Sequence, residues 1–406
     1  MTLAIKPKTD PGRQVIEAAA SVIEILQAHA GAADQENSMA EESIQALKDA
    51  HLVAAFVPQA LGGFGLASIH DWTLAIATLA RGDAAIAIAI NMHLGVSRGM
   101  ALAYYGAQEN AQAQQRLSQP LKQIAAGDML ICATATEPGT DNLHPRTEAV
   151  ANEHGWVING QKIFVTMSPV ATHLGMNLRM RDEHGDHLVS TLVPIDSPGL
   201  EPQNDWDALG MRGSGSQSVK FKDLQVPSQS IRKIGPWGQW SIGMLMNRAV
   251  ANLPLVGAFL GIAEAAHDIA MAQLATQSRV GQPVRELSGV QTLVGEMEIE
   301  LAKCRSILSA AATAMDDYLA ADEAPTLASA HNLMKDYQAA KWVVNRGAID
   351  IVSKAMDLLG GAGYTNKHPL ARLYRDVRAG PFMQPFAPTE AREYVGQVAL
   401  ECYPER

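Results

Sequence analysis

The spacing of the apolar residues changes twice along this chain of 406 residues. From about Val15 to Gly127, apolar residues recur at the intervals of a helix face. From about Met129 to Val226 they alternate with polar residues, which is typical of strands that bury one face. From about Trp240 onward the helical spacing returns. These blocks predict an α+β fold of three parts: a helical domain (1–127), a small antiparallel β domain (128–232) and a second helical domain (233–406).

Local signals predict where single elements begin and turn. Ser38-Met39-Ala40-Glu41 fits a capping box, in which a hydroxyl and a carboxylate satisfy free backbone donors ahead of a helix. Asn159-Gly160 separates two β-rich runs and is a strong hairpin signal. In the last part of the chain the pattern predicts long helices, over Ala249–Thr276, Val290–Leu319, Thr326–Leu359 and Thr389–Glu401.

The composition excludes several classes of partner. Lys and Arg total 32 against 42 Asp and Glu, so the net charge is -10 and attraction to nucleic acid or anionic membranes is not expected. The three cysteines are scattered, which speaks against a disulfide framework or a metal site and favours a cytoplasmic protein. The most apolar stretches, Ala84–Ile90 and Pro254–Ala263, are shorter than the roughly 20 residues that span a bilayer. We expect them to be buried helices.

Six short motifs follow one another along the chain, and their order carries more information than any one of them. Each is weak alone, but together they cover most of the chain: Gly62-Gly63-Phe64-Gly65, Thr136-Glu137-Pro138-Gly139, Asn159-Gly160-Gln161-Lys162, Leu209-Gly210-Met211-Arg212, Val219-x-Phe221-x-Asp223, and Gly360-Gly361-Ala362-Gly363 ahead of Arg375-Asp376. In this order the chain resembles the acyl-CoA dehydrogenase family of flavoproteins. The resemblance implies that family's fold, with a C-terminal four-helix bundle, and FAD as the cofactor.

The resemblance assigns the flavin ring to the middle domain. It implies that Thr136 and Thr166 hydrogen-bond the isoalloxazine and that Phe164 stacks on it, with Thr140 in a glycine run that is shorter here than in the family. A flavin needs donors along its polar edge and an apolar wall against its ring, which these residue types supply. The plainer interpretation of Phe164 and Thr166 is that they are strand residues with high β-propensity.

The dinucleotide half of FAD is less well matched. The family places an arginine from a neighbouring subunit at the pyrophosphate, which implies a homotetramer or homodimer. That position is Gln277 here, with Arg279 as the nearest substitute. Gln291, Gly360 and Gly361 match other cofactor positions, whereas the family's further FAD contacts are replaced, by Asp357, Phe386 and Pro388.

The catalytic base of the family is missing. Counting on from Arg375-Asp376, the glutamate that removes the substrate α-proton falls on Gln384. An amide has no basic lone pair to take a proton, so Gln384 cannot act as that base. Some family members carry the glutamate just before an arginine of the C-terminal domain, but the corresponding pair is Asn247-Arg248.

Three functions stay open on this basis. The favoured one is a flavin oxygenase, similar to oxygenase branches of the family, which uses molecular oxygen or an electron-transfer partner and acts on a CoA thioester or similar small molecule. Gln384, Asn247, Ser168 and His93 would supply hydrogen-bond donors, and Arg248, Met383 and Ser168 would contact the substrate. The alternatives are an acyl-CoA dehydrogenase with a relocated base, and a non-catalytic homologue that binds acyl-CoA or flavin.

Overall fold

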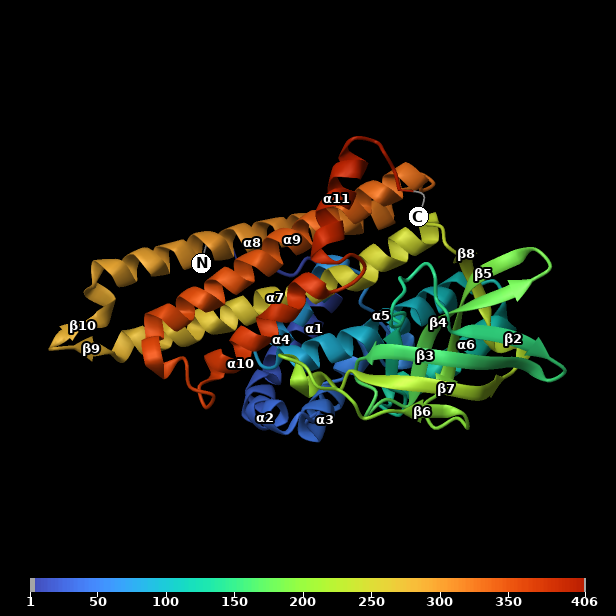
Figure 1. Ribbon diagram of the computed structural model, residues 1–406, viewed down its shortest axis with the longest axis horizontal. Coiled ribbons are helices and arrows are strands. Elements are labelled where there is room, and N and C mark those ends of the chain that lie inside the picture. The colour runs from blue at the N-terminus through green and yellow to red at the C-terminus, as the bar shows by residue number, and fades with distance from the viewer. Residues whose placement is uncertain (1–3, 405–406) are drawn as a thin grey trace.

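The structure, a computed structural model, describes residues 4–404 and shows an elongated molecule with a β domain at one end (Figure 1). Helices alone come first in the chain: α1 (Asp10–Ser21), α2 (Ile23–Glu36), α3 (Glu41–Asp49), α4 (Ile69–Ala80), α5 (Ala84–Gly106) and α6 (Ala111–Ala125). Short 3-10 helices join the main elements along the whole chain: η1 (Leu52–Ala54), η2 (Gln59–Leu61), η3 (Arg212–Ser214), η4 (Ser228–Ser230), η5 (Val284–Glu286), η6 (Gly360–Ala362) and η7 (Val377–Phe382).

The middle of the chain folds into one eight-stranded sheet. Its strands are β1 (Ile131–Thr134), β2 (Glu148–Asn152), β3 (Gly155–Val165), β4 (His173–Asp182), β5 (Gly185–Pro194), β6 (Leu200–Pro202), β7 (Gln217–Val226) and β8 (Arg232–Pro236). They lie in the order β6-β7-β3-β2-β4-β5-β8, with β1 beside β4. The expectation of a purely antiparallel sheet is wrong, because β1 and β2 both pair with β4 in parallel. β8 also carries the sheet beyond the expected domain limit at residue 232.

The predicted hairpin at Asn159-Gly160 is wrong. Strand β3 runs straight through this dipeptide, and its pairing with β7 shifts register between Ile158 and Gly160. Gly160 has a φ of +146°, and a Cβ there would lie 2.5 Å from the hydroxyl oxygen of Thr147. The backbone freedom that makes Asn-Gly a turn signal is used here for a β-bulge.

The predicted capping box is also wrong. Helix α3 begins at Glu41 with Ala40 as its N-cap, and no side chain caps it. Ser38 instead lies outside the helix, where its hydroxyl donates to Glu36 at 3.5 Å.

The C-terminal part is a bundle of long helices that agree closely with the predicted ones. They are α7 (Ile242–Thr276), α8 (Ser288–Ala320) and α9 (Leu327–Leu359), followed by α10 (Pro369–Asp376) and α11 (Pro388–Ala399). A small hairpin of β9 (Ser278–Arg279) and β10 (Gln282–Pro283) joins α7 to α8 at the end farthest from the sheet (Figure 1). Glycines let α7 approach α4 closely, since a Cβ at Gly261 would lie 2.2 Å from the carbonyl oxygen of Ala77.

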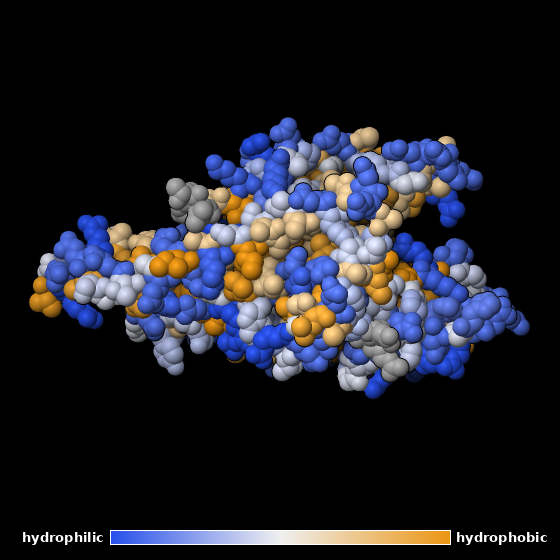
Figure 2. Space-filling model, turned by 90° about the horizontal axis from the view of Figure 1, so that it is seen from above, coloured by the Kyte–Doolittle hydropathy of each residue, from blue (hydrophilic) through white to orange (hydrophobic). Residues whose placement is uncertain are grey.

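Two helices are more apolar than the sequence analysis allowed for. Among residues 4–404, α5 and α7 are long and apolar enough to cross a membrane by length and composition. However, 61% and 83% of their most apolar windows are buried inside the protein, so packing in the core explains their hydrophobicity. Seen from above, the surface is hydrophilic over the sheet end, and apolar surface gathers over the middle of the molecule (Figure 2).

Candidate functional site

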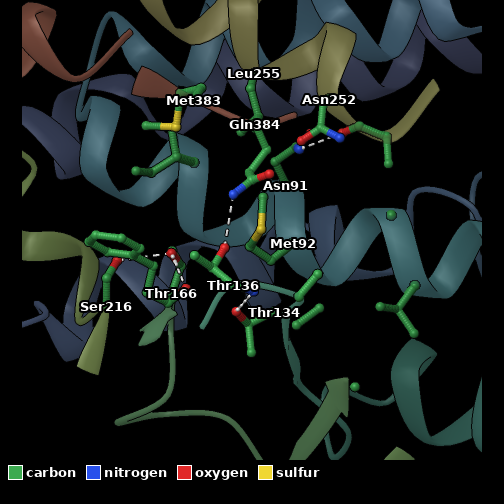
Figure 3. A pocket seen from close by; sticks show the side chains of 18 of the residues that line it. Asn91, Met92, Thr134, Thr136, Thr166, Ser216, Asn252, Leu255, Met383 and Gln384 are labelled. Carbon is green, nitrogen blue, oxygen red and sulfur yellow. Dashed lines mark hydrogen bonds between the residues drawn. The ribbon is translucent and has the colours of Figure 1, made fainter. Parts of the chain in front are cut away.

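A cavity of about 830 Å³ lies where α5, α7 and the segment after α10 meet the sheet. It brings together seven of the residues that the sequence singled out: Thr136, Phe164, Thr166, Asn247, Arg248, Met383 and Gln384. Figure 3 shows Gln384 and Met383 on one side of this space and Thr136, Thr166 and Ser216 on the facing side.

The side chain of Gln384 is held at both ends of its amide. Its Nε2 donates to the Thr136 hydroxyl at 3.0 Å, and its Oε1 accepts a hydrogen bond from Asn142. An amide with both ends bonded has one fixed orientation. Gln384 therefore presents a neutral, ordered group to the cavity.

Two side chains of α9 hold the backbone of the same segment. The Tyr337 hydroxyl donates to the carbonyl oxygen of Gln384 at 2.6 Å. One turn further along the helix, the Lys341 ammonium donates to the carbonyl oxygen of Phe386 at 2.7 Å and also to that of Met383. Lys341 is almost fully buried, and burial lowers its pKa to about 8. Buried groups on α9 thus fix the position from which Gln384 enters the cavity.

On the facing side, hydroxyl groups and aromatic rings form a wall. Thr166 and Ser216 share a hydrogen bond of 2.9 Å, and Ser216 is bonded in turn to Ser214. Phe164 lines the cavity, has a φ of +53° at a register shift between β3 and β7, and is 53% exposed. The ring of Trp206 packs edge to face against the Phe164 ring, with 6.0 Å between the ring centroids. Hydroxyls beside aromatic surface fit a planar ring with a polar edge, such as a flavin.

A buried ion pair supports this wall from behind. The Lys162 ammonium donates to Glu137 at 2.6 Å, and the backbone N–H groups of Arg146 and Thr147 donate to the same carboxylate. Both side chains are essentially inaccessible to water. Glu137 follows Thr136 and Lys162 precedes Phe164 by two residues, so the pair fixes the strand segments that carry both of these residues. It also leaves Glu137 with no free oxygen for catalysis.

The charged side chains in the cavity lining are all positive. Of the residues that the structure describes, those lining the cavity include no aspartate or glutamate but four arginines, namely Arg232, Arg248, Arg375 and Arg378. Arg375 is paired with Asp34. Burial lowers the pKa of Arg248 to about 10, which still leaves its guanidinium charged at neutral pH.

The structure argues against a catalytic role for His93. This residue is fully buried and does not line the cavity. Its Nε2 donates to the carbonyl oxygen of Val53 at 2.8 Å, and its Nδ1 accepts from the backbone N–H of Ile131 at 3.1 Å. Both ring nitrogens are therefore used to join α5 to its neighbours, and none is free for a flavin or substrate.

Two other predicted residues also lie outside the cavity lining. Thr140 donates to the carbonyl oxygen of His144 at 2.6 Å, which closes the turn after the shortened glycine run. Ser168 donates to the carbonyl oxygen of Gly215 at 3.2 Å. Their hydroxyls hold the local backbone.

The residues predicted for the dinucleotide half are remote from this chain's own cavity. Arg279 lies in β9, at the opposite end of the molecule from the sheet (Figure 1). Gln291 lies in the first turn of α8, where its amide donates to the carbonyl oxygen of Arg285 at 3.3 Å. Gly360 and Gly361 are exposed, and a Cβ on either would meet no atom within 4 Å. None of these four residues is part of the cavity lining that contains Phe164.

Sequence reasoning missed several amides at the site. Asn91 and Asn252 line the cavity, and Asn142 bonds to Gln384. Helical geometry could have found Asn91: residues 91, 95 and 99 share one face of α5, whereas His93, two residues on, points to the other side. The contact of Asn142 could not have been found this way, because it joins positions 242 residues apart.

Comparison with known proteins agrees with this arrangement. Residues 13–128, 131–224 and 247–384 match the N-terminal, middle and C-terminal domains of acyl-CoA dehydrogenase. The amino sugar nitrososynthase DnmZ of Streptomyces peucetius is 34% identical over 97% of this chain and 95% of that protein. L-evernosamine nitrososynthase of a Micromonospora species is 34% identical over 97% of this chain and 91% of that protein.

A solved structure resembles the whole chain in the same way. KijD3 in complex with FMN and dTDP-3-amino-2,3,6-trideoxy-4-keto-3-methyl-D-glucose superposes with a TM-score of 0.90 at 31% identity, over 98% of this chain and 96% of that chain. All three parts of the sequence match in order, and the match extends over nearly the full length of these relatives. The chain therefore belongs to the acyl-CoA dehydrogenase family.

Proposed function

We propose that this protein is a flavin-dependent oxygenase that oxidises the amine nitrogen of an amino sugar carried on a nucleoside diphosphate. The observation that carries the proposal is the amide of Gln384, fixed in a cavity whose described lining includes no carboxylate. The similarity to amino sugar nitrososynthases supports the same assignment. It replaces the CoA thioester expected from the sequence.

The site does not favour removal of a carbon-bound proton. That reaction needs a base within hydrogen-bond reach of the substrate. Asn247 and Gln384 line the cavity but are neutral amides. Glu390, a conceivable relocated base, is outside the described lining and accepts a hydrogen bond from the backbone N–H of Ala387 at the start of α11. A dehydrogenase with a moved glutamate therefore finds no support among these residues.

The same electrostatics suit oxidation of an amine. An amine must keep its lone pair to be oxidised, and a nearby carboxylate would favour the protonated form. Here the amides of Asn91, Asn252 and Gln384 can hydrogen-bond sugar hydroxyls, while the arginines disfavour a second positive charge. The site is thus suited to hold the substrate as the free amine.

The flavin that fits this proposal is FMN. When bound in its reduced form, it supplies the two electrons and the oxygen activation: R–NH2 + O2 + 2 electrons + 2 H⁺ gives R–NHOH + H2O. The similarity to KijD3, solved with FMN, supports this choice over the FAD expected from the sequence. The ring would lie against Thr136, Phe164 and Thr166. Arg279, remote from its own cavity, would serve the site of a second copy in a homodimer or homotetramer.

The test uses the purified full-length protein. Released flavin is identified by chromatography, and the protein is then supplied with reduced FMN, labelled oxygen and a dTDP-linked amino sugar. We expect substrate-dependent oxygen uptake and one labelled atom on the product nitrogen. Anaerobic bleaching of the flavin by acyl-CoA thioesters, with no oxygenated product, would establish the dehydrogenase instead. A protein without flavin or turnover would leave the non-catalytic homologue.

A further inference from the structure

The guanidinium of Arg248 is the one charged group that lines the cavity with a buried, unpaired atom among residues 4–404. Its Nη2 is buried, yet no hydrogen bond or ion pair among residues 4–404 uses this side chain. A buried, charged donor without an acceptor is strongly unfavourable, so such groups in folded proteins are usually paired. Arg248 therefore needs an anionic or hydrogen-bonding partner that residues 4–404 do not supply.

The carboxylate of the buried Glu137–Lys162 pair is not free to bind Arg248. Burial lowers the pKa of Lys162, Glu137 opposes that shift, and the positive charge of Arg248 adds to it, so Arg248 lies in the neighbourhood of the Glu137–Lys162 pair. Glu137 is occupied by Lys162 and by two backbone donors. The positive charge of Arg248 thus adds to that of Lys162, and Glu137 is already occupied.

The surroundings of Arg248 on the cavity side also contain an unused acceptor. Asn91 donates through its amide nitrogen to the carbonyl oxygen of Ala251, which lies on α7 within one turn of Arg248. The Oδ1 of Asn91 is buried and unpaired within the described chain. An unpaired donor and an unpaired acceptor, both on residues that line the cavity, indicate that a ligand with both kinds of group completes this place.

We propose that Arg248 forms a phosphate subsite in the cavity wall, with Asn91 beside it to accept from a neighbouring hydroxyl of the same ligand. The planar guanidinium can give two parallel hydrogen bonds to a phosphate, which an ammonium cannot. The phosphate can come from the nucleoside diphosphate of the substrate, in which case the subsite rests on the proposed function, or from FMN. In both cases Arg248 is a binding residue and its open bonding is completed by the ligand.

The experiment compares Arg248→Met with the wild type as full-length, flavin-containing proteins. Calorimetry measures binding of dTDP and of uncharged thymidine. Separate titrations measure retention of FMN and of riboflavin. We expect Arg248→Met to weaken either dTDP or FMN by about 10- to 100-fold, the loss of a charge-assisted hydrogen bond, while thymidine and riboflavin bind as before. A selective loss of dTDP assigns the subsite to the substrate, and a selective loss of FMN assigns it to the cofactor.

Thermal stability separates this role from a structural one. Removing a buried, unpaired charge should leave the melting temperature of Arg248→Met equal to or above that of the wild type. Arg116→Met is the matched control, since it removes the same charge from an exposed site on α6 outside the cavity lining. Unchanged binding of both dTDP and FMN would overturn the proposal, as would a large fall in melting temperature with parallel losses for charged and uncharged ligands. These binding measurements need no turnover, so they stand apart from the test of the oxygenase reaction.

Discussion

The amide nitrogen of Gln384 donates to the hydroxyl of Thr136 across 3.0 Å, and this bond joins the C-terminal domain to the segment that follows β1 at the cavity wall. Asn142 donates to the other end of the same amide, so the donor must face Thr136. A glutamate at this position would need a donor for each of its oxygens, and the Asn142 amide and the Thr136 hydroxyl can supply them. The surroundings of Gln384 therefore hold the amide in one orientation and can also accept the carboxylate of a Gln384→Glu variant.

Replacing Gln384 by Glu tests the charge of the site. A carboxylate within reach of the bound amine favours its protonated form, so the acidic limb of the kcat profile, which reports the enzyme–substrate complex, should move to higher pH by about 1 to 3 units. The measurement is oxygen uptake with a dTDP-linked amino sugar from pH 6 to 10, and the flavin content of the variant should match the wild type.

Gln384→Leu is the companion variant. It removes the hydrogen bonds without adding charge, so kcat/KM should fall by about 10-fold or more while the pH profile keeps its position. If both variants leave the profile and the rate unchanged, Gln384 does not contact the substrate.

The contacts of Tyr337 and Lys341 with the backbone of the Gln384 segment give a prediction about the pH dependence of stability. Burial holds the pKa of Lys341 at about 8, below its usual 10.5. The folded chain releases this proton more readily than the unfolded chain, so unfolding takes up a proton between these two values. The contribution of Lys341 to the free energy of unfolding should rise with pH across that window, with a slope of at most about 1.4 kcal/mol per pH unit.

Lys341→Met should remove that slope. The check is urea unfolding from pH 7 to 10, with Lys335→Met as the control because Lys335 lies on the same helix and its side chain is 28% exposed. Equal slopes in wild type and Lys341→Met would show that the buried ammonium does not titrate in this range.

Much of the fold followed from the sequence, and the reasons are physical. The long helices α7, α8 and α9 could be predicted because each of them extends over more than thirty residues, far beyond the length of a strand. The dipeptide Asn159-Gly160 misled because its preference for positive φ serves a bulge as well as a turn. Local signals of two to four residues report what the backbone can do, whereas the partner strand decides what it does.

At the site, some residues could be predicted from the sequence and others could not. Thr136, Phe164 and Gln384 could be placed because short motifs anchor them in the chain. The contacts of Tyr337 and Lys341 could not, since they join residues 42 to 47 positions apart through the packing of α9. The prediction placed His93 at the site, but Asn91 lines the cavity instead, because two residues on a helix differ by more than half a turn in direction.

Removing one partner of the buried Glu137–Lys162 pair should cost far more stability than removing one partner of a surface ion pair. Glu137→Gln or Lys162→Met each leaves an uncompensated buried charge, so each should lower the free energy of unfolding by about 3 to 5 kcal/mol. The double variant should lose much less than the sum of the two. Flavin content should fall in the single variants, because the pair fixes the strand segments that carry Thr136 and Phe164.

The surface pair of Arg81 and Asp268 is the control for this cycle. Its atoms are 2.7 Å apart, but both side chains are over 40% exposed, so breaking it should cost about 1 kcal/mol or less. Additive effects of Glu137→Gln and Lys162→Met would contradict a direct interaction between the two groups.

Gly99 offers a way to change the size of the cavity without touching its hydrogen bonds. It lies on α5 and lines the cavity, and a Cβ added there would meet no atom within 4 Å. Gly99→Ala should stabilise the protein by about 0.5 to 1 kcal/mol, because glycine is a poor helix former and no contact opposes the methyl group.

Gly99→Leu should instead extend into the space beside Met92 and Val96, and raise KM for a dTDP-linked amino sugar while flavin content stays the same. Gly31→Leu is the matched control, since Gly31 is an open position on α2 outside the cavity lining. If Gly99→Leu and Gly31→Leu have the same KM, the substrate does not occupy the part of the cavity that Gly99 lines.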